Sequence, residues 1–452
     1  MKINVLVAEI GSTTTVVNAF GDIHSDCPRF LGQGQASTTV MEGDVNMGLQ
    51  NAIEDLERKL DIQKLHYDEM LATSSAAGGL KMTVHGLVYD MTVKAAKEAA
   101  LGAGAIIHKV TSGKLRTSDL NAIMAIKPNL VLIAGGVDYG ERDTAIYNAE
   151  QIAGLDIHVP IVYAGNVENQ EEIREIFNNK KKELYIVDNV YPKIDQLNIE
   201  PTRNVIQKAF EEHIIHAPGM TSVRDLVTGP IIPTPGAVME ASKLLREEIG
   251  DLITLDVGGA TTDVHSVTEG SDEMNRILIS PEPMAKRTVE GDIGVYVNRE
   301  NIVNRIGKNV LQQQFVEDID LLIKNSRPIP KSTEEIKFVE VLTREAVITA
   351  MIRHAGKLRY LYGPTGKKTL AEGKDLTSIK WIIGTGGALT RLPNGPSILK
   401  EIPLYNKGDY LFPTMEAQVL IDRDYIMASL GVLSKKYPNA ALRLMLNSIR
   451  KE

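Results

Sequence analysis

The residues from Asp256 to Asp263 have the types and the spacing that suit a bound phosphate group. An apolar run ends at Leu255, and two glycines and two threonines then stand between the two acids. Glycine lets backbone N–H groups approach an oxyanion closely, and threonine hydroxyls add further donors. Asp256 could hold a hydrated Mg²⁺, which keeps most of its water and uses few carboxylates. The residues that we expect to contact phosphate here are Gly258, Gly259, Thr261 and Thr262.

A second turn of this kind lies between the predicted strands Ile3–Ala8 and Val16–Phe20. Glu9 stands two residues before its glycine, as Asp256 does in the other turn. We expect Glu9 and Asp256 to organise Mg²⁺ and the attacking water, and their residue types leave open which of them is the general base. The expected phosphate contacts of this turn are Gly11, Ser12, Thr13, Thr14 and Thr15.

A third glycine-rich turn follows the short strand Trp381–Ile383. Its glycines would let a flat base and a ribose lie against the backbone before a helix begins. The expected contacts are Gly384, Thr385, Gly386, Gly387 and Ala388. Each turn alone also fits a plain hairpin or a strand-to-helix corner, but the three in this order indicate one nucleotide site.

This order resembles the actin/Hsp70/sugar-kinase ATPase superfamily. Glu9–Thr15 matches its phosphate-1 motif, Asp256–Asp263 its phosphate-2 motif and Gly384–Ala388 its adenosine motif. Val289–Val295 looks like its ribose-side segment, which adds Gly291 and Asp292 as contacts. The resemblance implies a two-lobed actin-like (ribonuclease H-like) α/β fold that closes on ATP and Mg²⁺. The superfamily has aspartate where this chain has Glu9, which bears on the hydrolysis rate more than on nucleotide binding.

At a finer level the chain resembles the MutL (GlmL) accessory proteins encoded beside adenosylcobalamin-dependent glutamate mutase. Leu132–Asp138, Pro233–Ala241 and Arg287–Asp292 carry this resemblance. Relatives accompany other mutases and aminomutases, including those of ornithine degradation. The resemblance implies an ATP-driven, chaperone-like reactivating factor whose partner is a mutase or aminomutase subunit of amino-acid fermentation. It does not extend to the mismatch-repair protein of the same label, whose nucleotide-pocket motif is missing.

Three other functions fit the same turns. A small-molecule kinase of the superfamily would need an acid aimed at a substrate hydroxyl, and the sequence offers no isolated candidate. A nucleotide-binding scaffold with little turnover is compatible with Glu9. A dehydratase activator with a bridging iron–sulfur cluster is disfavoured, since Cys27 is the single cysteine. His213 and His216 fit a surface pair better than a metal site.

Composition narrows the class of protein. The chain has 452 residues and a net charge of −8, which argues against a nucleic-acid partner because such binding needs a basic footprint. It has no apolar run long enough for a membrane span, and Glu9 interrupts the first apolar stretch too early for a signal peptide. We therefore expect a cytoplasmic protein with no membrane partner, and a homo-oligomer is possible.

Alternating strands and helices from about 80 to 200 predict a doubly wound parallel sheet inserted into the first lobe. We predict lobe I at 1–80 and 201–250, the insert at 81–200, lobe II with the adenosine motif at 251–415, and C-terminal helices returning to lobe I at 416–452.

Four further segments are predicted from local patterns. We expect an irregular stretch at 228–235, a mostly helical stretch at 334–361, a polar loop at 363–374 and a helix at 417–431.

Overall fold

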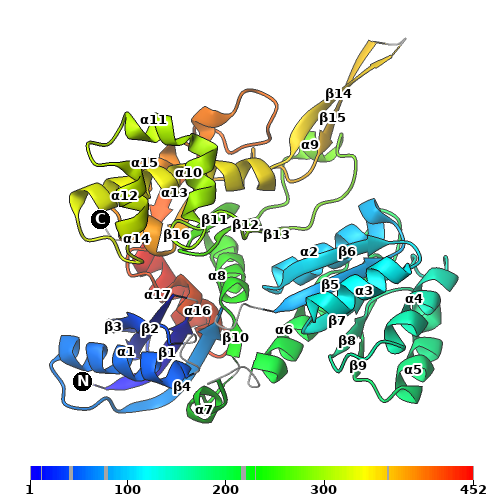
Figure 1. Cartoon of the computed structure of the whole chain (residues 1–452), viewed down its shortest axis with the longest axis horizontal. Coiled ribbons are helices and arrows are strands. Elements are labelled where there is room, and N and C mark those ends of the chain that lie inside the picture. The colour runs from blue at the N-terminus through cyan, green and yellow to red at the C-terminus, as the bar shows by residue number, and fades with distance from the viewer. Residues whose placement is uncertain are drawn as a thin grey trace.

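The computed structural model describes residues 2–11, 13–39, 44–75, 80–214, 220–229, 231–363 and 366–450. It contains three five-stranded sheets and one separate two-stranded hairpin. Figure 1 shows the three sheets as three bodies, with the hairpin β14–β15 standing away from them. Our prediction for His216 falls outside the described residues.

The first sheet has five strands in the order β10-β4-β1-β2-β3. Strands β1, β2 and β3 are antiparallel neighbours, while β4 runs parallel to β1 and β10 parallel to β4. Every residue of β1 is buried, as expected for a central strand covered on both faces. The strands are β10 (Ile231–Pro233), β4 (Tyr67–Ser74), β1 (Ile3–Ile10), β2 (Thr14–Gly21) and β3 (Arg29–Ser37).

The second sheet repeats this topology with a later part of the chain. Its order is β13-β12-β11-β16-β17, again with three antiparallel strands followed by two parallel ones. The strands are β13 (Ala285–Glu290), β12 (Thr262–Val267), β11 (Leu252–Val257), β16 (Trp381–Thr385) and β17 (Gln418–Ile421). Two lobes built on one repeated mixed sheet confirm the predicted two-lobed actin-like α/β fold.

The third sheet is entirely parallel, in the order β6-β5-β7-β8-β9. It lies in the chain between β4 and β10 of the first sheet, which confirms an inserted doubly wound α/β unit. Its strands are β5 (Lys81–Gly86), β6 (Ile106–Ser112), β7 (Leu130–Ile133), β8 (Ile161–Tyr163) and β9 (Leu184–Ile186). The exact residue boundaries of the lobes stay predictions.

Helices cover the sheets and join them. Those of the first lobe and the insert are α1 (Val45–Leu60), α2 (Lys94–Gly102), α3 (Thr117–Ile126), α4 (Asp143–Ala153), α5 (Gln170–Asn179), α6 (Glu200–Ile214), α7 (Met220–Leu226) and α8 (Thr234–Ile249). Those that follow are α9 (Asp272–Asn275), α10 (Arg299–Ile306), α11 (Lys308–Gln312), α12 (Ile319–Asn325), α13 (Thr333–His354), α14 (Gly387–Thr390), α15 (Gly395–Lys400), α16 (Met427–Leu433) and α17 (Pro438–Arg450). No helix within these described ranges is long and apolar enough to cross a membrane.

Helix α16 packs closely against both α8 and the first sheet. A Cβ added at Gly431 would lie 1.8 Å from the carbonyl oxygen of Ala237, so the α16–α8 contact requires glycine there. Asn18 of β2 donates to the hydroxyl of Ser429, 2.8 Å away and fully buried. The C-terminal segment therefore returns to the first sheet.

Three local predictions are wrong. β10 lies in the stretch expected to be irregular, and β17 lies in the stretch expected to be helical. Helix α13 covers most of 334–361, as predicted, and ends at His354. The residues after it form the hairpin of β14 (Lys357–Gly363) and β15 (Gly366–Glu372), and β15 occupies the stretch expected to be a polar loop. Short strands escape sequence patterns because neighbouring strands, distant in the chain, supply their hydrogen bonds.

Candidate functional site

The β1–β2 turn and the β11–β12 turn have the same local geometry. The N–H of Gly11 donates to the carbonyl oxygen of Thr14 at 2.9 Å, and the N–H of Gly258 donates to that of Thr261 at 3.0 Å. A Cβ at Gly11 would lie 2.7 Å from the oxygen of Thr14, so this turn requires glycine. The repeated topology of the two sheets thus gives each lobe one donor-rich turn.

The two turns face each other across one cavity. Its volume is about 350 Å³, and a Cβ added at Gly259 would lie 3.7 Å from Thr13 Oγ1 in the other turn. The predicted site residues that line the cavity are Glu9, Gly11, Thr13, Thr14, Asp256, Gly258, Gly259, Thr261, Gly387 and Ala388. Turns that are hundreds of residues apart therefore share one cavity, as the three motifs predict.

Two carboxyl groups lie at the inner end of this cavity. Glu9 is the second-last residue of β1 and Asp256 the second-last residue of β11, each two residues before the glycine of its turn. Burial, together with the nearby Asp256 and Asp422, raises the pKa of Glu9 to about 8. Burial also raises the pKa of Asp256 to about 7, with Asp263 adding to the effect and Arg287 opposing it. A neighbouring positive charge would therefore stabilise the ionised form of both acids.

These acids fit a hydrated Mg²⁺. Glu9 Oε2 is buried and has no hydrogen-bond partner among the described residues. A buried carboxylate oxygen without a partner is costly, and a cation or its water would satisfy it. The described residues hold no group of three or more His, Cys, Asp or Glu placed for a metal. A metal bound here would need water and phosphate oxygens as its remaining ligands.

Asp263 also reaches the cavity, but its carboxylate has other partners. Arg287 of β13 donates to Asp263 Oδ1 from Nε at 2.9 Å and from Nη2 at 2.6 Å. The hydroxyl of Thr261 donates to Asp263 Oδ2 at 3.1 Å. The side chains of Arg287 and Asp263 are 1% and 4% exposed. Asp263 therefore orients Thr261 and is not free to bind a cation.

An apolar wall that the sequence motifs do not contain completes the cavity. It comes from the loop before α13, from α13 itself and from the end of α14: Pro328, Ile329, Pro330, Val339 and Leu392. Arg391 and Tyr425 also line the cavity, and the guanidinium of Arg391 lies 5.7 Å from the centre of the Tyr425 ring. Arg391 also donates to Gln33 of β3, so it joins the two lobes at this site. The Pro-Ile-Pro sequence was the only available signal for this wall.

Other predicted site residues lie outside the cavity lining. The hydroxyls of Thr15 and Thr38 share a hydrogen bond, and that of Thr262 donates to the carbonyl oxygen of Ile293. Thr385 donates to Asp422, and Arg353 bonds to Asp292. These partners are structural, so their side chains support the turns. The predicted residues outside the lining are Thr15, Thr262, Gly291, Asp292, Gly384, Thr385 and Gly386. Ser12 lies outside the described residues.

Gly386 nevertheless shapes the cavity from behind. Its φ of +81° favours glycine, and an added Cβ would lie 2.4 Å from Asp256 Oδ1. The backbone between β16 and α14 therefore lies so close to Asp256 that only glycine fits at position 386.

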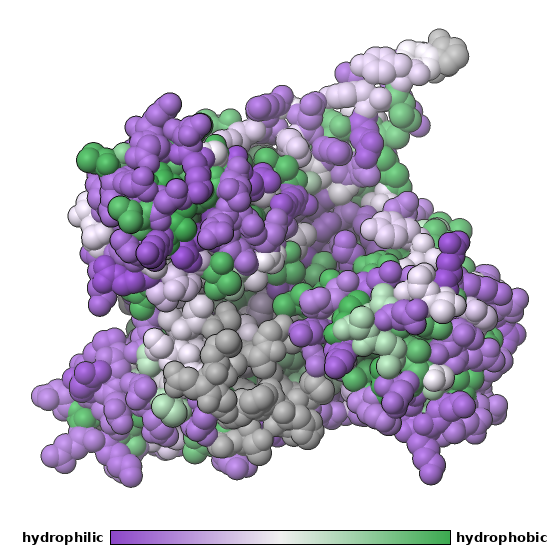
Figure 2. Space-filling view, viewed as in Figure 1, coloured by the Kyte–Doolittle hydropathy of each residue, from purple (hydrophilic) through white to green (hydrophobic). Residues whose placement is uncertain are grey.

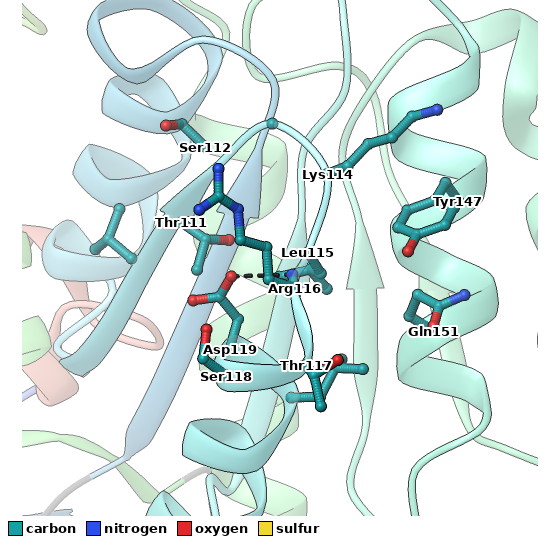
Figure 3. A pocket seen from close by; sticks show the side chains of 13 residues that line it. Thr111, Ser112, Lys114, Leu115, Arg116, Thr117, Ser118, Asp119, Tyr147 and Gln151 are labelled. Carbon is teal, nitrogen blue, oxygen red and sulfur yellow. Dashed lines mark hydrogen bonds between the residues drawn. The ribbon is translucent and has the colours of Figure 1, made fainter.

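A larger and more open cavity, of about 910 Å³, lies on the third sheet. Figure 3 shows it between the loop that joins β6 to α3 and the side chains of Tyr147 and Gln151 on α4. Its one acid, Asp119, accepts from the N–H of Arg116 at 3.0 Å and caps α3. Its other polar side chains are mostly exposed, and it has no buried acid pair. The interlobe cavity is therefore the better candidate for chemistry.

Comparison with known proteins assigns nearly the whole chain to one family. Residues 5–449 match the family model described as MutL protein. Protein MutL of Clostridium tetanomorphum is 36% identical over 455 residues, which cover 97% of this chain and 98% of that protein.

Solved structures align over most of the chain at low identity. A nucleotide-free acetone carboxylase covers 96% of this chain and 70% of its own at 13% identity, with a TM-score of 0.42. A nucleotide-free diol dehydratase-reactivating factor covers 97% and 100% at 10% identity, with a TM-score of 0.39. On the family match and on the identity to the clostridial protein, the chain belongs to the MutL protein family.

Proposed function

We propose that this chain binds and hydrolyses ATP with Mg²⁺ in the interlobe cavity and uses that cycle to reactivate an adenosylcobalamin-dependent mutase or aminomutase of amino-acid fermentation. The observation that carries the ATP part is the shared cavity. Two donor-rich turns, one from each lobe, meet there in front of the buried Glu9 and the half-buried Asp256, whose pKa values are both raised. A triphosphate would supply acceptors for the donors of the turns, and a divalent cation would supply positive charge for the two acids.

The residues divide into three roles. Glu9 and Asp256 hold the hydrated cation and position the attacking water. The hydroxyls of Thr13 and Thr14 and the N–H of Gly259 contact the phosphates, and Thr261 joins them when its hydroxyl turns away from Asp263. Such catalysis depends on positioning and on neutralised charge, which donors fixed in advance supply. The apolar wall receives the base. The bound cation would lower the barrier by spreading the charge that develops on the phosphate oxygens.

The carboxylates favour hydrolysis over transfer to a metabolite. The acids that line the cavity within the described residues are Glu9, Asp256 and Asp263. Asp263 is bonded by Arg287 and Thr261, and the other two are needed for the cation. A kinase requires another acid aimed at a substrate hydroxyl.

The mutase part rests on family membership, with support from the name of the clostridial relative. We infer that the lobes close on the nucleotide and that the third sheet, inserted in lobe I at 81–200, transmits the movement to the partner subunit. The α2 helix of that sheet packs against β13 of lobe II, which gives such a movement a route. We place this activity in the cytoplasm.

An ATPase assay on purified full-length chain tests the first part. Asp256→Asn should lower phosphate release on the order of 100-fold because it weakens the hold on the cation, and Thr13→Ala should lower it about tenfold because it removes a donor to the developing charge. Thr117→Ala, at an exposed threonine on the third sheet, is the matched control and should hydrolyse like wild type. Unchanged hydrolysis in Asp256→Asn would refute the assigned site.

Reactivation of an inactivated mutase tests the second part. Glutamate mutase and ornithine aminomutase, inactivated by turnover, should regain activity with the chain, ATP, Mg²⁺ and fresh adenosylcobalamin. Asp256→Asn should fail to restore either. Recovery of neither enzyme by the wild-type chain counts against the chaperone role, and a phosphorylated metabolite formed faster than free phosphate would favour a kinase.

A further inference from the structure

Among the described residues, the hairpin of β14 and β15 is anchored to the rest of the chain at its base. On one side, the N–H of Leu358 donates to the carbonyl oxygen of Asp409 at 2.7 Å. On the other, Ala371 donates to Ile277 at 2.9 Å and accepts from Ile279 at 2.8 Å. Both edges of the base are therefore covered, and the ladder continues outward from there.

The outer half of this hairpin, Tyr360–Gly363 with Gly366–Thr369, is here called the arm. No hydrogen bond or ion pair joins the described residues of the arm to another part of the described chain. The side chain of Tyr362 is 78% exposed and that of Leu361 is 54% exposed. Figures 1 and 2 show the arm standing clear of the molecular surface. A two-stranded ribbon without a packed face is only marginally stable in water. A partner surface that covers the arm would therefore stabilise it.

The register of the ladder divides the side chains of the arm between two faces. Tyr360 lies opposite Thr369 and Tyr362 lies opposite Lys367, all on one face. Leu361 lies opposite Lys368 on the other face. The Lys367 ammonium is 3.6 Å from the centre of the Tyr360 ring, a cation–π contact that holds the ring in place. Tyrosines of this kind offer large contact area at low entropic cost and are frequent anchors of protein interfaces.

The charge of the hairpin is opposite to that of the whole chain. Residues 357–372 contain four basic side chains and one acidic side chain, Glu372, which pairs with Arg359. The hairpin therefore has a net charge of +3 in a chain whose net charge is −8. An acidic protein surface is repelled by most of this chain and attracted to the arm, which favours encounter in one orientation.

We propose that the arm docks on an acidic, apolar-pocketed surface of the mutase subunit, with Leu361 and Tyr362 as anchors and Lys367 and Lys368 as the charges that guide approach. This inference rests on the proposed function, because it names the element that grips the same partner. A nucleic acid or an anionic membrane would also attract lysines, but each needs a wider basic surface than this acidic chain offers.

Binding of the full-length chain to immobilised, purified glutamate mutase and ornithine aminomutase tests this inference. Leu361→Ser/Tyr362→Ser and Lys367→Glu/Lys368→Glu should each raise Kd tenfold or more and leave ATP hydrolysis unchanged. The matched controls, at exposed residues outside the inserted sheet, are Leu404→Ser/Tyr405→Ser and Lys324→Glu/Lys407→Glu, which should stay within twofold of wild type. Added salt should weaken wild type more than the charge-reversed arm variant.

The outcomes separate the two proposals. If wild type and arm variants bind a mutase equally, the docking role of the arm is refuted and the proposed function stands. If wild type neither binds nor reactivates either mutase, the docking role and the proposed function are both refuted. If wild type binds single-stranded oligonucleotide or phosphatidylserine vesicles, and only the charge-reversed arm variant loses that binding, the protein partner is wrong.

Discussion

Arg287 of β13 donates from Nη1 to the carbonyl oxygen of Leu101 at the end of α2, 2.9 Å away. The same guanidinium donates to Asp263 Oδ1, and the Oδ2 of Asp263 accepts from the hydroxyl of Thr261 in the cavity. One fully buried side chain therefore connects the β11–β12 turn of lobe II to the inserted sheet. Any shift of that turn on binding phosphate acts on α2 through this contact.

Removal of Arg287 should cost far more than removal of an exposed arginine. Arg287→Met leaves the Asp263 carboxylate buried without its cation, so the free energy of unfolding should fall by about 3–5 kcal/mol. Arg29→Met, which breaks an exposed pair with Asp22, should cost about 1 kcal/mol or less. Urea unfolding measures both. The double variant Asp263→Asn/Arg287→Met should cost less than the sum of its single changes, and simple additivity would contradict a direct pair.

Glu9 should make stability depend on pH in the absence of metal and nucleotide. Its pKa is about 8 in the folded chain and ordinarily 4.5, so the folded state binds the proton more tightly. The contribution of Glu9 to the free energy of unfolding is therefore fully present below pH 4.5 and is lost as the pH rises through 8. Glu9→Gln keeps a neutral group and should avoid a loss of up to about 5 kcal/mol. Unfolding in a chelator at pH 5, 7 and 9 measures this, with exposed Glu54→Gln as control; equal slopes for Glu9→Gln and wild type would contradict it.

Gly386 should tolerate no side chain. Gly386→Ala forces a positive φ on alanine and places its Cβ 2.4 Å from Asp256 Oδ1. We expect a Tm loss corresponding to about 1–3 kcal/mol and a nucleotide Kd at least tenfold weaker, because Asp256 must move. Gly387→Ala is the neighbouring control, since a Cβ there meets no atom within 4 Å and the fold should be unaffected. A Gly386→Ala variant as stable as wild type would show that the corner relaxes.

The apolar wall should bind the base and not the phosphates. Ile329→Ser should weaken ATP binding about tenfold by removing apolar contact, while binding of inorganic tripolyphosphate changes little. Titration calorimetry with both ligands separates contacts to the base from contacts to the phosphates. Val316→Ser, at a valine 99% exposed, is the control. Equal losses for ATP and tripolyphosphate would place the base elsewhere.

Much of the fold and of the phosphate side of the site followed from local pattern. Glycine and threonine after an apolar run dictate a donor-rich turn, and Glu9 and Asp256 precede their glycines at the same spacing. Alternating strands and helices predicted the inserted parallel sheet. Family resemblance then joined the turns into one nucleotide site.

Only the tertiary structure decided which distant groups meet. The Pro328–Pro330 loop reaches the cavity because α13 packs against the second sheet, and Arg287 reaches Leu101 because the insert of one lobe rests on a strand of the other. The hairpin escaped prediction because both of its faces are polar or exposed, so no period-2 apolar pattern marks it. Local sequence determines turns and strand pairs, since their partners lie a few residues away. Long-range packing determines the wall, the buried ion pair and the anchorage of the hairpin base, since their partners lie tens to hundreds of residues away.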